Sequence, residues 1–141
     1  MGMKINRTLP GPDEIKAKYP LTPDLKKLKD KRDREIKDVI SGRSDKFLVI
    51  TGPCSADRED CVLEYIEKLA VLADKLKDRL VVVPRVYTNK PRTTGEGYKG
   101  MLHQPRPDDA PDLEAGIIAI RKLHLAVMEK CGLTSADEML Y

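Results

Sequence analysis

The chain has 141 residues, a normal length for one domain and too short for a closed barrel of eight βα units, which needs about 250. Lys and Arg number 26 against 23 Asp and Glu, and the charge of +3 is spread without a basic block, which disfavours nucleic-acid binding. No apolar run approaches the roughly 18 residues of a membrane span, so the sequence predicts no membrane partner.

The three cysteines, Cys54, Cys61 and Cys131, form no CxxC pair. An odd number of cysteines in a chain without a signal peptide argues against a disulfide framework. We therefore expect reduced thiols and a cytoplasmic location.

The N-terminal part of the sequence predicts a helical extension. Prolines among charged residues indicate an extended arm with a short helix around residues 13–18. Thr22 and Pro23 have the character of an N-cap and first helical residue, and Gly42 is typical of a helix end. The helix predicted over residues 23–40 has few apolar positions, so we expect it to lie on another surface, such as that of a second subunit.

From residue 44 the pattern changes to alternating strands and helices. The apolar run at residues 47–50 predicts a strand buried on both faces, and residues 80–86 predict a second strand. A helix is predicted between them over residues 57–77, with Asp57 as its N-cap. A strand, a crossover helix and a strand form a right-handed βαβ unit, and hence a parallel sheet.

A long loop over residues 87–111 follows the second predicted strand. Its length far exceeds the two to six or so residues usual at a strand-to-helix junction, and such loops are functional or disordered. A helix over residues 112–130 and the start of a third strand at residues 136–140 come next. The sequence thus predicts an α/β protein in which two and a half βα units cannot close a barrel.

The first candidate site follows the first predicted strand, where chemistry sits in parallel α/β proteins. Gly52 and Pro53 predict a tight turn that aims the Cys54 thiol at the carboxyl edge of the sheet. A thiolate there is a soft ligand for a divalent metal, or a nucleophile if its pKa is lowered. The alternative is a small buried side chain.

The second candidate site begins where the second strand ends. Arg85 closes that strand, and Lys90, Arg92 and Thr93 follow in a loop rich in glycine and hydroxyl side chains. Arginine forks, lysine ammonium groups and backbone N–H groups suit carboxylates and phosphates. The alternative is a solvated surface loop, but an arginine at the end of a buried strand needs an anionic partner.

The remaining candidates are two histidines and one acidic residue. His103 lies in the loop, and His124 lies on the apolar stripe of its helix, where a hydrogen-bonded core or interface histidine is expected. Glu138 lies in the predicted third strand and points either into the barrel or toward the helices.

In order and spacing, these segments resemble motifs of the type I 3-deoxy-7-phosphoheptulonate (DAHP) synthases over residues 20–141. The segments are Gly52-Pro53-Cys54-Ser55, Arg85-Val86-Tyr87, Lys90-Pro91-Arg92-Thr93-Thr94 and Tyr98-Lys99-Gly100. The resemblance implies a (β/α)8 TIM barrel with an N-terminal extension. Residues 1–43 are then the arm and helix used for oligomerisation or regulation, and residues 44–141 are the first two and a half βα units of an incomplete barrel.

The resemblance also implies a reaction, in which phosphoenolpyruvate condenses with erythrose 4-phosphate in the first step of the shikimate pathway. The family uses a divalent metal such as Mn, Fe, Zn or Co, and its metal-binding cysteine falls on Cys54. Its phosphoenolpyruvate-binding arginine and lysine fall on Arg85 and Lys90, which are the catalytic candidates. Further substrate-binding candidates are Pro91, Arg92 and Thr93 for erythrose 4-phosphate and Glu138 for phosphoenolpyruvate.

The family's other metal ligands, a His, a Glu and an Asp, come from later strands, and one thiolate cannot hold a catalytic metal. We therefore expect a truncated DAHP synthase chain that is inactive alone. The alternative is a noncatalytic oligomerisation or regulatory fragment that pairs with itself or with a full-length synthase. Both hypotheses expect a homo-oligomer.

Overall fold

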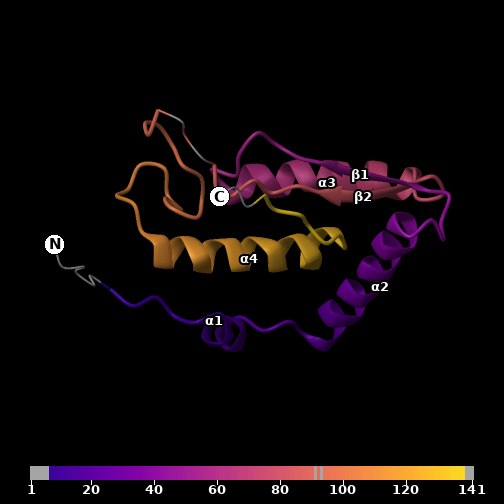
Figure 1. The fold of residues 1–141 in the computed structure, drawn as a ribbon, viewed down its shortest axis with the longest axis horizontal. Coiled ribbons are helices and arrows are strands. Elements are labelled where there is room, and N and C mark those ends of the chain that lie inside the picture. Colours follow the sequence, from indigo (N-terminus) through magenta and orange to yellow (C-terminus); the bar gives the residue numbers. More distant parts are fainter. Residues whose placement is uncertain (1–6, 91, 93, 139–141) are drawn as a thin grey trace.

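The computed structural model describes residues 7–90, 92 and 94–138. Figure 1 shows two adjacent strands, two helices packed near them, and an N-terminal arm that leads into an oblique helix. In chain order the elements are α1 (Pro12–Lys18), α2 (Pro23–Ile40), β1 (Phe47–Thr51), α3 (Glu59–Lys75), β2 (Leu80–Pro84) and α4 (Leu113–Cys131).

The sheet is parallel, as the βαβ pattern predicts. β1 pairs with β2 in a register that aligns Phe47 with Leu80 and Thr51 with Pro84. Ala136 makes an isolated parallel bridge with Arg85, where the third strand is predicted to begin. Asp137 and Glu138, which follow in that predicted strand, are not in a strand, and residues 139–140 lie outside the described residues. The described residues thus form a partial α/β unit with a two-stranded parallel sheet.

The prediction that β1 is buried on both faces is wrong. Phe47 is 74% exposed and Ile50 is 54% exposed, whereas Val81, Val82 and Val83 of β2 are buried. Within the described residues β1 has β2 as its hydrogen-bonded neighbour on one side. An apolar run marks a strand, but its burial depends on neighbours that the run does not encode.

The core lies between the sheet, α3 and α4, and α3 packs on both β2 and α4. α3 begins at Glu59 with Arg58 as N-cap, so the predicted Asp57 cap is wrong. The Asp57 carboxylate instead accepts a hydrogen bond from the Arg58 N–H at 2.9 Å. The buried residues of the core cluster are Ala56, Val62, Leu63, Ile66, Val86, Met101, Leu123, Val127 and Leu133.

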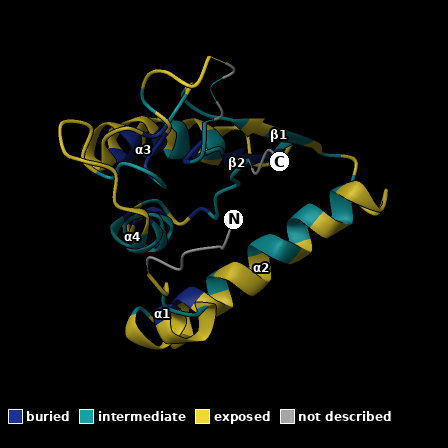
Figure 2. Ribbon diagram, turned by 60° about the vertical axis from the view of Figure 1, so that its left-hand side comes forward, coloured by how far each residue is buried: buried dark blue, intermediate teal, exposed yellow. Residues whose placement is uncertain are grey.

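The predicted start of α2 is confirmed, because the Thr22 hydroxyl accepts a hydrogen bond from the Leu25 N–H at 3.3 Å. Leu25 is the buried residue of this helix, and the rest of its surface is largely exposed or half-buried (Figure 2). α2 contacts β1, β2 and α4. The surface on which it lies therefore includes this chain's own sheet.

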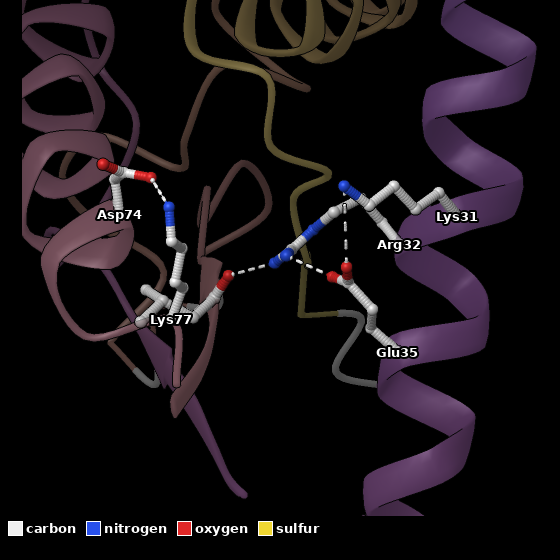
Figure 3. A network of polar contacts seen from close by, with 6 residues as sticks. Lys31, Arg32, Glu35, Asp74 and Lys77 are labelled. Carbon is white, nitrogen blue, oxygen red and sulfur yellow. Dashed lines mark hydrogen bonds and ion pairs between the residues drawn. The ribbon is translucent and has the colours of Figure 1, made fainter. Parts of the chain in front are cut away.

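Arg32 of α2 makes the polar contact with that sheet. Its Nη2 donates to the Val82 carbonyl at 2.6 Å, and its Nη1 pairs with Glu35 at 2.5 Å (Figure 3). Two residues along β2, the Pro84 carbonyl accepts from the Ala136 N–H at 2.9 Å. Carbonyls two residues apart point to the same edge of a strand. Arg32 therefore bonds the same edge of β2 as Ala136, two residues nearer the start of the strand.

The arm and α1 lie along α4 (Figure 1). Arg121 of α4 donates to the Tyr19 carbonyl through Nε at 3.0 Å and Nη2 at 2.9 Å, and Arg7 pairs with Glu114. Ile15 of α1 is buried. In the described part of the chain, no helix combines the length and apolarity needed to cross a bilayer.

Candidate active site

The two candidate segments meet at one edge of the sheet, because β1 and β2 are parallel and both segments follow their carboxyl ends. The Arg85 N–H donates to the Thr51 carbonyl at 2.8 Å, which extends the pairing beyond the strands. A side chain on Gly52 would overlap the carbonyl of Arg85. The glycine therefore permits the close backbone approach that brings the two segments together.

Arg85 is the most firmly held cation of this edge. Its Nη1 donates to Glu138 Oε1 at 2.6 Å, and its Nη2 donates to the Pro53 carbonyl at 2.8 Å. The guanidinium carbon lies 4.9 Å from the centre of the Tyr87 ring, a cation–π arrangement. A guanidinium has five N–H donors, so the hydrogen bonds to Glu138 and Pro53 orient it and leave three for a ligand.

Glu138 is the carboxylate that Arg85 pairs with, and its side chain is 40% exposed. Sequence spacing left the direction of this side chain open, and the structure turns it toward the carboxyl end of β2. Glu138 and Arg85 line an open hollow of about 510 Å³ together with residues of the β1 end. Two larger hollows, of about 890 and 930 Å³, lie around the starts of α4 and α3 and are not lined by Arg85 or Glu138.

Cys54 and Lys90 are in direct contact. Lys90 Nζ donates to Cys54 Sγ at 2.7 Å, and Cys54 is exposed. This hydrogen bond and the charge of Lys90 lower the pKa of Cys54 below its ordinary value of 9.0, and the charges of Arg85 and Arg92 act in the same direction. The edge thus gathers three cations around one thiol, an environment that favours its thiolate form.

The loop after β2 is folded back on itself. The Lys90 N–H donates to the Lys99 carbonyl at 3.0 Å, and Arg92 Nε donates to the Tyr98 carbonyl at 2.8 Å. Gly100 has φ of 93° and lies where a side chain would overlap the Thr88 carbonyl, so this return of the chain requires glycine. Pro91 and Thr93, both predicted substrate-binding residues, lie outside the described residues.

Tyr98 ties the loop to the segment that carries Cys54. Its hydroxyl lies 3.2 Å from the Ala56 carbonyl and 3.1 Å from the Gln104 carbonyl, so its proton is shared between two acceptors. Burial raises the pKa of Tyr98 to about 12, with a smaller contribution from the charge of Asp57. The hydroxyl therefore remains a donor at neutral pH.

Sequence reasoning missed Asp137 and Thr88. Asp137 Oδ1 accepts a hydrogen bond from the Thr88 N–H at 3.0 Å, and Oδ2 accepts one from the Thr88 hydroxyl. Thr88 is 2% exposed and lies between Arg85 and Lys90 in the chain. An acidic residue at the start of a predicted strand, beside Glu138, was the available signal, because neighbours in a strand face opposite sides.

The candidate metal ligand Cys54 stands alone among the residues placed by the structure, where no group of three His, Cys, Asp or Glu side chains converges. The nearest partner of its sulfur is the ammonium of Lys90. These residues do not by themselves fit a catalytic metal, which needs several protein ligands. No chemical step is therefore assigned to a metal on this chain.

The fold and this edge define a class, namely an α/β protein that gathers cations at the carboxyl ends of parallel strands. The chain belongs to the DAHP synthetase I family, whose model matches residues 18–139.

Curated relatives and a solved structure carry the same resemblance. The chain is 40% identical over 130 residues to the Tyr-sensitive phospho-2-dehydro-3-deoxyheptonate aldolase of Escherichia coli (strain K12), covering 92% of this chain and 36% of that protein. It is 35% identical over 137 residues to the Phe-sensitive aldolase of the same strain, covering 97% of this chain and 38% of that protein. The chain thus spans little more than a third of these relatives.

The fold matches that of a phospho-2-dehydro-3-deoxyheptonate aldolase from Francisella tularensis SCHU S4 with a TM-score of 0.87 and 29% sequence identity. The match covers 99% of this chain and 40% of that chain. The arm, the oblique helix and the strand edge therefore follow the arrangement found in a member of the family.

Proposed function

We propose that this chain is the N-terminal part of a DAHP synthase, an enzyme that condenses phosphoenolpyruvate with erythrose 4-phosphate. Family membership supports the reaction class. The position of the site is supported by Arg85, whose hydrogen bonds to Glu138 and Pro53 orient its guanidinium at the carboxyl edge of the sheet. The proposal includes the finer fold, in which residues 44–141 are the first βα units of a TIM barrel and residues 1–43 are an oligomerisation or regulatory extension.

In this proposal Arg85 and Lys90 hold phosphoenolpyruvate. Arg85 has three N–H donors beyond those bonded to Pro53 and Glu138, which suits a carboxylate or phosphate held by two oxygens. Lys90 offers an ammonium at the same edge, with its Nζ on Cys54. Glu138 balances the charge of Arg85 and fixes its plane, so the anion meets a preorganised donor.

Erythrose 4-phosphate would be held by the loop after Lys90. Arg92 is the candidate cation of that loop, and its Nε bond to the Tyr98 carbonyl leaves its terminal N–H groups for a phosphate. Pro91 and Thr93 remain sequence-based candidates beside it. The family generally uses a divalent metal, and we propose Cys54 as the ligand that this chain contributes.

Anion binding tests the proposed site directly. Titration of the ¹⁵N-labelled chain with phosphoenolpyruvate should shift the amide signals of Arg85 and Lys90, with Kd in the millimolar range, on the order of 4 kcal/mol. Exposed charges are screened by salt, so affinity should fall as ionic strength rises. Arg85→Ala should remove the response.

The matched control is Lys77→Ala, which deletes an exposed cation paired with Asp74, away from the strand edge. Binding by this variant should equal that of the wild type. An unchanged response in Arg85→Ala, or an equal loss in Lys77→Ala, would mean that the signals report general charge attraction and not this site.

Turnover is the second test. The chain alone, with phosphoenolpyruvate, erythrose 4-phosphate and Mn²⁺, should show no consumption of phosphoenolpyruvate, because among the described residues no group of three potential metal ligands converges at Cys54. Robust turnover would show that this chain by itself completes a catalytic metal site.

A second candidate function is a noncatalytic module that pairs with another copy of this chain. The observation that favours it is a set of exposed apolar side chains on β1 and in and just after α3. They include Phe47, Ile50, Tyr65, Leu72 and Leu76, from 38% to 74% exposed. Light scattering at increasing concentration should then detect a dimer that Phe47→Lys weakens, whereas a monomer at all concentrations contradicts this candidate.

A further inference from the structure

Asp137 lines the same hollow as Arg85 and Glu138, and the proposed function gives its carboxylate no role. Its side chain is 20% exposed. Besides the two bonds from Thr88, its Oδ1 accepts a hydrogen bond from the Glu138 N–H at 2.8 Å. The Asp137 carboxylate therefore holds the backbone of Thr88, which leads to Lys90, and the backbone of Glu138, which orients Arg85.

Thr88 connects Asp137 to the candidate site, because it is hydrogen-bonded to Asp137 and lies two residues before Lys90. Its backbone N–H and its hydroxyl both donate to Asp137, and its carbonyl accepts from the Leu102 N–H at 3.0 Å. Gly100 packs against the same carbonyl. A buried residue fixed in this way sets the direction in which the chain leaves toward Lys90.

His124 of α4 completes the surroundings of Asp137. His124 Nε2 lies 3.9 Å from Asp137 Oδ2, while its Nδ1 is hydrogen-bonded to the Ser135 hydroxyl at 2.6 Å. Burial by itself would raise the pKa of Asp137, but the contacts with His124, Thr88 and Glu138 outweigh burial and lower it. The carboxylate is therefore charged at neutral pH and acts as an acceptor only.

We propose that Asp137 is a positioning residue, which holds Thr88 and Glu138 so that Lys90 and Arg85 converge on one phosphoenolpyruvate molecule. The inference rests on the proposed function, since it requires this edge to bind that anion. Without the carboxylate, two buried donors of Thr88 lose their acceptor, and the segment that leads to Lys90 shifts to find another.

The sign of the effect separates positioning from plain electrostatics. Asp137 is a negative charge near a site for anions, so loss of the charge alone should tighten anion binding. Loss of positioning should weaken it. Asp137→Ala removes both the charge and the acceptors, whereas Asp137→Asn removes the charge but keeps Oδ1 as acceptor for the two N–H groups.

The test is titration of the chain with phosphoenolpyruvate, followed through backbone amide signals. We expect the Kd of Asp137→Ala to rise at least about fivefold, and that of Asp137→Asn to stay within about twofold of the wild type or fall. The unliganded Lys90 amide signal should move in Asp137→Ala and stay in Asp137→Asn. Asp74→Ala, which removes an exposed carboxylate on α3, is the matched control and should change neither.

The outcomes are distinct. No binding by the wild type would refute the proposed function. Equal or tighter binding by Asp137→Ala, with wild-type binding intact, would overturn the positioning role and leave the proposed function standing. If Asp137→Ala loses the β2 amide pattern and does not fold, Thr88→Val decides: it deletes only the hydroxyl donor and should weaken binding about twofold, and unchanged affinity would overturn the inference.

Discussion

Lys90 Nζ lies 2.7 Å from Cys54 Sγ, although 36 residues separate them and each follows a different strand. The contact exists because the parallel pairing of β1 and β2 places both carboxyl ends at one edge. A candidate substrate-binding cation and a candidate metal ligand are therefore direct partners in this chain.

Replacement of Lys90 by Met should make Cys54 less reactive at neutral pH. Lys90 lowers the pKa of Cys54, first through its hydrogen bond and then through its charge, so its loss should move that pKa back toward 9.0. The measurement is the rate of iodoacetamide alkylation of Cys54 against pH, read by peptide mass spectrometry. The midpoint should shift to higher pH in Lys90→Met.

Cys131 provides an internal reference for this experiment. Burial raises its pKa, and the charge of Glu67 adds to the effect. Wild-type Cys54 should therefore react at lower pH than Cys131 in the same sample. Alkylation of both thiols over one pH range would contradict the ammonium contact.

Asp137 should contribute stability that is lost in acid. Its pKa in the folded chain lies below the ordinary value of 3.8, so its contribution is fully present above about pH 4 and disappears as pH falls through the folded pKa. Urea unfolding between about pH 6 and pH 2.5 should show a shallower fall for Asp137→Asn than for the wild type. Asp24→Asn, at a side chain 92% exposed, should follow the wild type.

Gly52→Ala should destabilise the chain by about 2–4 kcal/mol, because a methyl group there overlaps the Arg85 carbonyl and forces the strand ends apart. Denaturant unfolding measures this change. At Gly11 a methyl group would meet its nearest atom, Glu14 Oε2, at 3.7 Å, so Gly11→Ala should cost less than about 1 kcal/mol. Equal losses of unfolding free energy in the two variants would show that the ends of β1 and β2 can move apart without destabilising the chain.

Arg32→Leu should destabilise the chain by about 1–2 kcal/mol, because the Val82 carbonyl loses its donor. The figure is at the lower end for such a loss, since Arg32 Nε is buried without a hydrogen-bond partner among the described atoms and its removal offsets part of the cost. Arg34→Leu, at an exposed position of the same helix, should change stability by less than about 0.5 kcal/mol. The comparison requires only equilibrium unfolding curves.

Local chemistry made much of this fold predictable. Thr22 caps α2 as predicted, since short polar side chains before a helix bond its first N–H groups. Asp112, predicted as the first residue of α4, caps that helix by the same chemistry. The burial of β1 and the Asp57 cap were predicted wrongly. The burial of β1 depends on which strands lie beside it. The Asp57 carboxylate does not cap α3 because it accepts its hydrogen bond from the N–H of the adjacent residue, Arg58.

The location of the candidate site was predictable, and the roles of its residues stay predictions. Cys54, Arg85 and Lys90 are recognisable because each follows a strand closely, and parallel strands bring such positions together. The pairing of Asp137 with Thr88 was not recognisable, because 49 residues separate them and no periodicity relates them. Contacts of this kind depend on tertiary packing, which brings the segment after α4 beside the end of β2.

Arg32 has a consequence for how this chain can meet other chains. A guanidinium laid across the Val82 carbonyl denies that point of β2 to an incoming strand, because the acceptor is already used and a charge would have to be buried. In the described structure no charged side chain is hydrogen-bonded to the backbone of β1 in this way, and its Phe47 and Ile50 are exposed to water. A strand from another chain is therefore blocked at Val82 on the outer edge of β2, whereas the outer edge of β1 remains open to strand addition among the described residues.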